Sequence, residues 1–213
     1  MVFQTIKIVP PRKEIYQRLG CRREITQLTP QQEKLTDTSI EEAASFITLK
    51  GAALRIPILE RKDDMILLGG DIRLQSANLA FILRDCTEAL LMGATAGHAI
   101  IAATQENLKN NAVAKAAVFD ATASEMTDGA LEWLMDYYRR SLLRERKNLL
   151  TKRYSAGYGD FSLENQRLFY TLLNLEAIDI RITADNILIP EKSVTAITGI
   201  RDIDDRDDRA PVV

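Results

Sequence analysis

Histidine is almost missing from this chain of 213 residues, because His98 is the only one. A histidine-dependent catalytic triad would have to use that residue, and no Gly-x-Ser-x-Gly elbow accompanies it. A histidine-rich metal site is excluded for the same reason. The two cysteines, Cys21 and Cys86, lie far apart without a paired spacing. We therefore expect no catalytic triad, no metal site and no disulfide framework, and a reducing, cytoplasmic location.

Two phosphate-binding motifs are also missing. The P-loop pattern Gly-x-x-x-x-Gly-Lys-Ser/Thr does not occur. Gly157 and Gly159 match the first half of the dinucleotide fingerprint Gly-x-Gly-x-x-Gly, but Ser162 stands where the third glycine belongs. A bound nucleotide would have to be held by a different geometry.

The chain has neither a strong charge of one sign nor a long apolar run. With 28 basic and 30 acidic residues its formal net charge is −2, so no positive field is available to attract nucleic acid or an anionic membrane. No run of about 18 apolar residues is present to span a bilayer, and the first residues lack the signal-peptide pattern. A hydrophobic fraction of 46% instead indicates an ordinary globular protein with a sizeable core.

Local signals in the first half of the chain predict alternating helices and strands. Thr29 can cap a helix that begins at Pro30, and Gln32 can complete a capping box. Pro57 favours an edge position for its strand, because proline cannot donate to a ladder. The expected elements are a strand within 1–11, a helix at 12–19 closed by Gly20, a helix at about 30–47, a hairpin over 52–68, a helix after 69–71 that ends near 84–85, a strand at 89–94 and a helix at 98–108.

The second half begins with the most helical part of the chain. Residues 110–144 are rich in alanine, and Gly129 is a candidate break that would divide them into two helices. We expect a further helix at 163–173 and strands at 178–182, 186–189 and 193–200. The predicted fold class is α/β of the α+β type, with helices packed on a mostly antiparallel sheet. Residues 1–200 would form one domain, and 201–213 a charged, flexible tail.

The stretch Arg153–Asp160 is the best candidate for a ligand-binding loop. Arg153 can hold a carboxylate through two parallel hydrogen bonds, and Gly157 lets the main chain approach a ligand closely. Tyr154 or Tyr158 can cover an aromatic ring. These capacities suit a nucleoside that carries an amino acid. The alternative is that Arg153 pairs with a structural acid and that the glycines only permit a tight turn.

Two other segments have a functional and a structural interpretation. Ala94–His98 can present N–H groups at a helix start to an anion, or it can simply pack closely between a strand and a helix. The basic stretch Arg139–Lys152 is either a solvated helix end that complements the helix dipole or a docking patch. For both segments we favour the structural interpretation, close packing at Ala94–His98 and a solvated helix end at Arg139–Lys152.

Several segments together resemble the reactivation domain of cobalamin-dependent methionine synthase, which binds S-adenosylmethionine. Arg153-Tyr-Ser-Ala-Gly-Tyr-Gly-Asp160 and Ile189-Pro-Glu-Lys-Ser-Val194 are the specific parts of this resemblance. Leu68-Gly-Gly-Asp-Ile72, Leu91-Met-Gly-Ala-Thr-Ala-Gly97 and Asp120-Ala-Thr-Ala-Ser124 occur in the expected order. The similarity covers about residues 12–200 and is greatest to stand-alone relatives of that domain.

The resemblance implies a fold, a ligand and a partner. The fold is a twisted antiparallel sheet with flanking helices. The ligand is S-adenosylmethionine, whose methyl group remethylates cobalamin after a flavodoxin-like donor has reduced it. The chain lacks the Asp-x-His-x-x-Gly pattern of cobalamin carriers, so a separate methionine synthase or corrinoid methyltransferase must bring the cobalamin.

The same resemblance implies the site residues. Arg153 meets the methionine carboxylate, while the backbone of Ser155 and Gly157 and the ring of Tyr158 line the ligand. Asp128 falls near the acidic contact to the ribose, where the family has glutamate. The family has an aromatic residue near the position of Thr198, and its N-terminal acidic contact has no clear counterpart in residues 1–50. These two departures motivate an alternative, a non-catalytic binding or assembly protein that has kept the fold and lost the ligand. An independent methyltransferase with another acceptor is a third possibility, for which no general base stands out.

Overall fold

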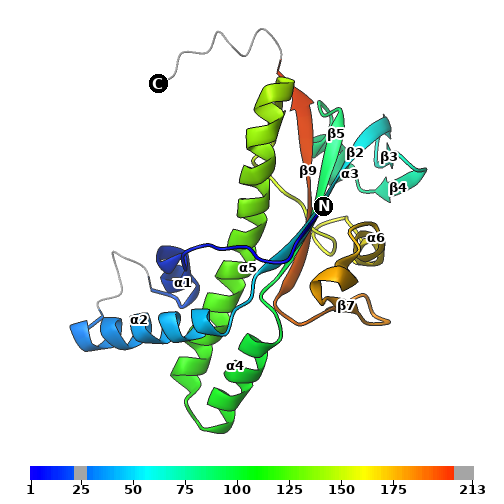
Figure 1. Ribbon diagram of the computed structural model, residues 1–213. Coiled ribbons are helices and arrows are strands. Elements are labelled where there is room, and N and C mark those ends of the chain that lie inside the picture. The colour runs from blue at the N-terminus through cyan, green and yellow to red at the C-terminus, as the bar shows by residue number, and fades with distance from the viewer. Residues whose placement is uncertain (22–27, 204–213) are drawn as a thin grey trace.

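The computed structural model describes residues 1–21 and 28–203. Within them, seven strands form one antiparallel sheet in the order β4-β3-β2-β5-β9-β6, and β1 pairs with the start of β2 (Figure 1). A separate small hairpin consists of β7 and β8. The strands are β1 (Val2–Phe3), β2 (Lys50–Lys62), β3 (Met65–Leu68), β4 (Ile72–Gln75), β5 (Glu88–Thr95), β6 (Lys147–Leu149), β7 (Arg181–Ile182), β8 (Leu188–Ile189) and β9 (Ser193–Asp202).

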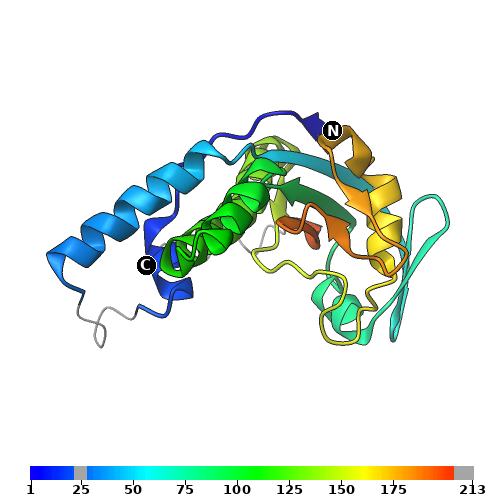
Figure 2. The same cartoon turned by 90° about the horizontal axis from the view of Figure 1, so that it is seen from below.

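Helices cover both faces of this sheet. The long helix α5 packs on one face with α2 and α4, whereas α3 and α6 lie on the other (Figures 1 and 2). The helices are α1 (Arg12–Arg18), α2 (Pro30–Ser45), α3 (Ala77–Ile82), α4 (Ala99–Lys109), α5 (Val113–Leu142) and α6 (Asn165–Leu172), with 3-10 turns at Leu143–Glu145 and Leu175–Ile178. The expected α+β architecture with a mostly antiparallel sheet is confirmed.

Strand β5 shows why the sheet is buried on both faces. Leu90 and Met92 belong to the core under α5, and Ala89 and Leu91 to the core on the opposite face. Successive side chains of a strand point to opposite faces, so a continuous apolar run is what a doubly covered strand requires. The apolar stretch that predicted this strand therefore also places it at the centre of the sheet.

The helix start signals are correct. Gln32 N–H donates to the Thr29 hydroxyl, and the Gln32 side chain accepts from Thr29 N–H at 2.8 Å, which completes the predicted capping box. Gly20 follows α1 with a φ of 85°, a left-handed conformation that glycine adopts without strain. Short-range hydrogen bonds therefore set these two helix ends.

Three predictions about elements are wrong. Pro57 lies in a central strand and not at an edge. It is tolerated there because the β2–β3 ladder ends at this residue, so that no N–H is needed on that side. The hydrogen bond toward β5 is made by the neighbouring Ile58 N–H. The turn at 69–71 leads into strand β4 before α3 begins. Gly129 does not divide α5, which is continuous over 30 residues. A Cβ at Gly129 would lie 2.7 Å from Ile8 Cδ1, so glycine is used there for close packing.

The last described strand runs past residue 200. Strand β9 continues to Asp202, two residues into the predicted tail, because β6 pairs with Ile200–Asp202. Residues 204–213 lie outside the described residues, and the single-domain assignment of 1–200 stays a prediction.

In the Ala94–His98 segment, Gly97 N–H donates to the Thr95 hydroxyl at 3.1 Å and Ala94–Ala96 are buried, which favours the close-packing interpretation.

Candidate functional site

An open stretch at the edge of strand β9 creates the space for a site. Strand β6 covers the outer edge of β9 only at Ile200–Asp202, and a single bridge then joins Tyr154 to Ile197. The two bridge hydrogen bonds, Tyr154 N–H to Ile197 O and Ile197 N–H to Tyr154 O, are both 2.8 Å long. By strand alternation the backbone N–H and C=O of Thr195 point to this same edge. Beyond Tyr154 the chain turns away, so the edge at Ser193–Thr195 is left open.

The predicted loop provides the tight turn that carries the chain away from β9. Gly157 has a φ of 89° and donates its N–H to Phe161 O at 2.8 Å. Gly159 has a φ of 54°, and a Cβ there would lie 2.4 Å from the Tyr154 hydroxyl. Phe161 is buried in the core, which holds the far end of the turn in place. Both glycines are therefore required by the turn itself.

Asp160 anchors this loop to the start of α3. Its carboxylate accepts from Ser76 Oγ at 2.6 Å, from Asn78 N–H at 3.1 Å and from Asn78 Nδ2 at 3.0 Å. The hydrogen bond from Ser76, supported by those from Asn78 and the Ala77 backbone, lowers the pKa of Asp160 to about 2. Asp160 thus keeps its negative charge and holds the loop in one position.

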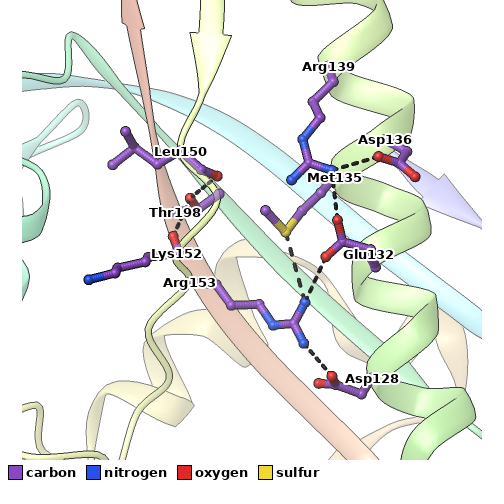
Figure 3. Close-up of polar contacts among 9 residues, drawn as sticks. All are labelled: Asp128, Glu132, Met135, Asp136, Arg139, Leu150, Lys152, Arg153 and Thr198. Atoms are coloured by element: carbon purple, nitrogen blue, oxygen red, sulfur yellow. Dashed lines mark hydrogen bonds and ion pairs between the residues drawn. The ribbon is translucent and has the colours of Figure 1, made fainter. Parts of the chain in front are cut away.

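Arg153 points from the start of the loop to helix α5 (Figure 3). Its Nη2 lies 2.5 Å from Asp128 Oδ2, and its Nη1 lies 3.2 Å from Glu132 Oε2. Nη1 is also 4.0 Å from Met135 Sδ. Residues 128, 132 and 135 share one face of α5, because positions four and seven apart fall on the same side of a helix. The site therefore combines a strand edge, a tight turn and one helix face.

These elements enclose a cavity of about 340 Å³. Asp128, Arg153, Ser155 and Tyr158, four of the five predicted site residues, line it together. Its apolar lining includes Leu131, and its other lining residues are Tyr154, Ala156, Gln166, Ser193, Val194 and Thr195. Tyr158 lines the cavity although it is 69% exposed, so its ring is accessible to a ligand. The cavity offers one guanidinium, one carboxylate, hydroxyls and apolar surface.

Two residues singled out from the sequence do not line the cavity. Gly157 shapes the turn, and its N–H is already bonded to Phe161 O. Thr198 is fully buried, and its hydroxyl donates to the carbonyl of Lys152 at 2.8 Å, with the carbonyl oxygen of Leu150 3.2 Å away (Figure 3). The absence of an aromatic side chain at position 198 therefore removes no wall from this cavity.

Apart from Asp128, the residues that α5 and the strand edge contribute were not predicted from the sequence. Leu131 and Glu132 lie next to Asp128 on the helix, and their spacing of three and four residues from it was the available signal. Thr195 donates its hydroxyl to Gln166 Oε1 at 2.8 Å, which fixes one side of the cavity. Nothing in the local sequence indicates that the edge of β9 is open at Thr195.

Two further kinds of feature are absent from the part of the chain that the structure describes. Among residues 1–21 and 28–203, no group of three or more His, Cys, Asp and Glu side chains is placed to hold a metal ion. No helix in the same part of the chain is both long and apolar enough to cross a membrane.

Comparison with known proteins supports the fold and nothing finer. No protein-family model and no curated protein matches the chain. Among solved structures, the chain is similar to one described as the MetH reactivation domain bound to AdoHcy, with a TM-score of 0.64 and 13% identity. The match covers 86% of this chain and 71% of that one. The described residues therefore have a fold similar to that of the MetH reactivation domain, as the sequence motifs predicted.

Proposed function

We propose that the cavity between β9, α5 and the 153–160 loop binds S-adenosylmethionine, and that the protein is a stand-alone reactivation subunit for a corrinoid enzyme. The observation that carries this proposal is the meeting of Arg153, Asp128, Ser155 and Tyr158 in one cavity. They come from segments up to 30 residues apart in the chain, and the motif resemblance had assigned them to one ligand.

The chemistry of the lining fits the parts of S-adenosylmethionine. The planar guanidinium of Arg153 suits the ligand carboxylate, and the carboxylate of Asp128 suits ribose hydroxyls. Leu131 and Val194 offer apolar surface to the base, and the exposed ring of Tyr158 can cover it. A volume of about 340 Å³ lies at the lower end of the usual range for small-molecule pockets, roughly 300–1,000 Å³.

Binding would exchange one set of partners for another. In the structure Arg153 pairs with Asp128, and a ligand that engages both residues must separate them. Asp128 is 52% exposed, so water and salt already screen this ion pair and opening it costs little. The ion pair is therefore compatible with a ligand site, and it orients both side chains in the absence of the ligand.

The function of the bound ligand would be to donate a methyl group to a corrinoid on another protein. The sulfonium of S-adenosylmethionine makes that methyl group electrophilic, and AdoHcy, found with the similar domain, is what remains after its loss. The chain would contribute binding and orientation, since the cofactors supply the reactive groups. The corrinoid and the reducing electron come from partners, a methionine synthase or corrinoid methyltransferase and a flavodoxin-like donor.

Calorimetric titration with S-adenosylmethionine tests the binding step. We expect saturable binding by the wild-type protein and at least about a tenfold loss of affinity in Arg153→Ala, because a charge-assisted bidentate contact is removed. Arg140→Ala is the matched control, since it removes an exposed guanidinium of α5 that does not line the cavity. No binding by the folded wild-type protein at millimolar ligand would overturn the proposal.

A second experiment tests the reactivation step. The protein is mixed with S-adenosylmethionine, a reducing donor and a corrinoid methyltransferase in its oxidised state, and the corrinoid spectrum is followed. At a ligand concentration close to the wild-type dissociation constant, we expect methylated corrinoid to form much faster with wild-type protein than with Arg153→Ala. Ligand binding without any acceleration of remethylation would leave only the binding function.

The alternative is a binding or assembly protein without the ligand, and the satisfied ion pairs of Arg153 are the observation in its favour. The departure at Thr198 no longer supports it, because that residue lies outside the cavity. Under this alternative Arg153→Ala changes stability alone, and the titration above distinguishes the two.

A further inference from the structure

Glu132 is the acidic residue of α5 that contacts Arg153 but does not line the cavity. Its Oε2 lies 3.2 Å from Arg153 Nη1, while its Oε1 accepts from Arg139 Nη1 at 2.7 Å. Arg139 in turn donates to Asp136 Oδ1 at 2.6 Å. Figure 3 shows these side chains as one row along α5, running from Asp136 and Arg139 through Glu132 to Arg153.

The nitrogen atoms of the Arg153 guanidinium have different surroundings. Nη1 is turned to α5, where it meets Glu132 and Met135. Nη2 is bonded to Asp128, and Nε has no acceptor among the residues that the structure describes. Once Asp128 releases Nη2, the Nε–Nη2 edge is a complete two-donor fork, and Nη1 remains tied to the helix.

We infer that Glu132 is a positioning residue, which holds Arg153 through Nη1 so that the Nε–Nη2 edge faces the carboxylate of the ligand. This inference rests on the proposed function, because it concerns the same cavity and the same ligand. Arg139 supports Glu132 from the far side and limits its rotamers. Asp128 is thereby the exchangeable partner of Arg153, and Glu132 is the permanent one.

The positions of the two acids fit this division. Asp128 lines the cavity and can turn to ligand hydroxyls, whereas Glu132 lies outside the lining and has its two oxygens on two different arginines. Without Glu132, the long side chain of Arg153 would regain rotamer freedom, and part of the binding free energy would be spent on ordering it. The effect should depend on the ligand carboxylate.

The test compares two ligands on three proteins by calorimetry. S-adenosylmethionine carries the carboxylate, and 5′-methylthioadenosine retains the nucleoside but lacks the amino-acid portion. For Glu132→Ala we expect about a tenfold loss of affinity for S-adenosylmethionine and less than about a twofold change for 5′-methylthioadenosine. Asp136→Ala, which removes an acid from the same row without touching Arg153, should leave both affinities unchanged.

The outcomes separate this inference from the proposed function. Equal losses of affinity for the two ligands would indicate general damage to the cavity and would overturn the positioning role alone. No loss for either ligand would overturn it as well, because Arg153 would then not depend on Glu132. A folded wild-type protein that binds neither ligand overturns the proposed function and the inference with it. Glu132→Gln keeps the shape and one acceptor, so an intermediate loss in that variant supports the role and replaces Glu132→Ala if the alanine variant does not fold.

Discussion

At the scale of single residues, the question is whether the contacts of Arg153 exist for stability or for a ligand. Its side chain is 23% exposed, but its partners Asp128 and Glu132 are 52% and 49% exposed. Ion pairs of such accessible groups contribute little to folding, because water competes for each charge. The ion pairs of Arg153 therefore add little to stability, which agrees with the ligand-binding role proposed for this residue.

Arg153→Ala should change the free energy of unfolding by less than about 1 kcal/mol. Arg55 is the contrasting variant, since it pairs with Glu88, which is only 17% exposed, and the hydrogen bonds to Glu145 and then Glu88 raise the pKa of Arg55. Arg55→Ala leaves that sheltered carboxylate with fewer partners and should cost about 1–3 kcal/mol. Urea denaturation of both variants checks this, and a larger loss for Arg153→Ala would assign it a structural role.

At the scale of elements, the 153–160 loop is held at both ends by different means. At one end Tyr154 bridges to β9, and at the other Asp160 caps the start of α3. Between these anchors the two glycines turn the chain without strain. The loop is thus a fixed wall of the cavity, attached to both the sheet and a helix on its far face.

The Asp160 anchor should respond to acid. Because its folded-state pKa, about 2, is below the usual value of 3.8, its contribution to stability is complete above about pH 4 and is lost as the pH falls through 2. The stability difference between wild type and Asp160→Ala should therefore shrink between about pH 4 and pH 2. Thermal unfolding across that range measures it, with the exposed Asp85→Ala as control. A difference that does not vary with pH would contradict the anchor.

At the scale of the whole molecule, the sheet is bound on one face by α5 and crossed by the N-terminal segment. Figure 2 shows an arched arrangement with α1 and α2 toward one end and α3 and α6 toward the other. Ile6 belongs to the core under α5, and its Cδ1 occupies the space that a Cβ at Gly51 would need, 2.9 Å away. The N-terminal segment therefore supports the sheet without contacting the cavity.

Ile6→Ala should separate stability from binding. Ile6 is 4% exposed, so its truncation should cost about 2–4 kcal/mol through lost burial and a residual cavity. Val9 is 83% exposed, and Val9→Ala should change stability by less than about 0.5 kcal/mol. Affinity for S-adenosylmethionine should remain at the wild-type value in both variants at temperatures where they are folded. Loss of affinity in folded Ile6→Ala would show that the core and the cavity are coupled.

The structural features that depend on residues close together in the sequence were predicted correctly. The Thr29–Gln32 capping box, the glycine after α1 and the doubly buried strand β5 follow from hydrogen bonds and periodicities that span a few residues. The motif around Arg153 likewise predicted the fold through its resemblance to a known domain. The predictions at Pro57 and Gly129 were wrong because both residues are accommodated by distant parts of the chain, the end of the β2–β3 ladder for Pro57 and Ile8 for Gly129.

The sequence by itself determined the helices, most strands and the loop that turns away from β9, because their signals are local. Only the tertiary structure decided which residues share the cavity. Asp128 and Arg153 are 25 residues apart and meet because α5 packs across the sheet beside the open edge of β9. It also placed Thr198 outside the cavity and Glu132 behind Arg153. Such contacts depend on the packing of whole elements, for which no short stretch of sequence carries a signal.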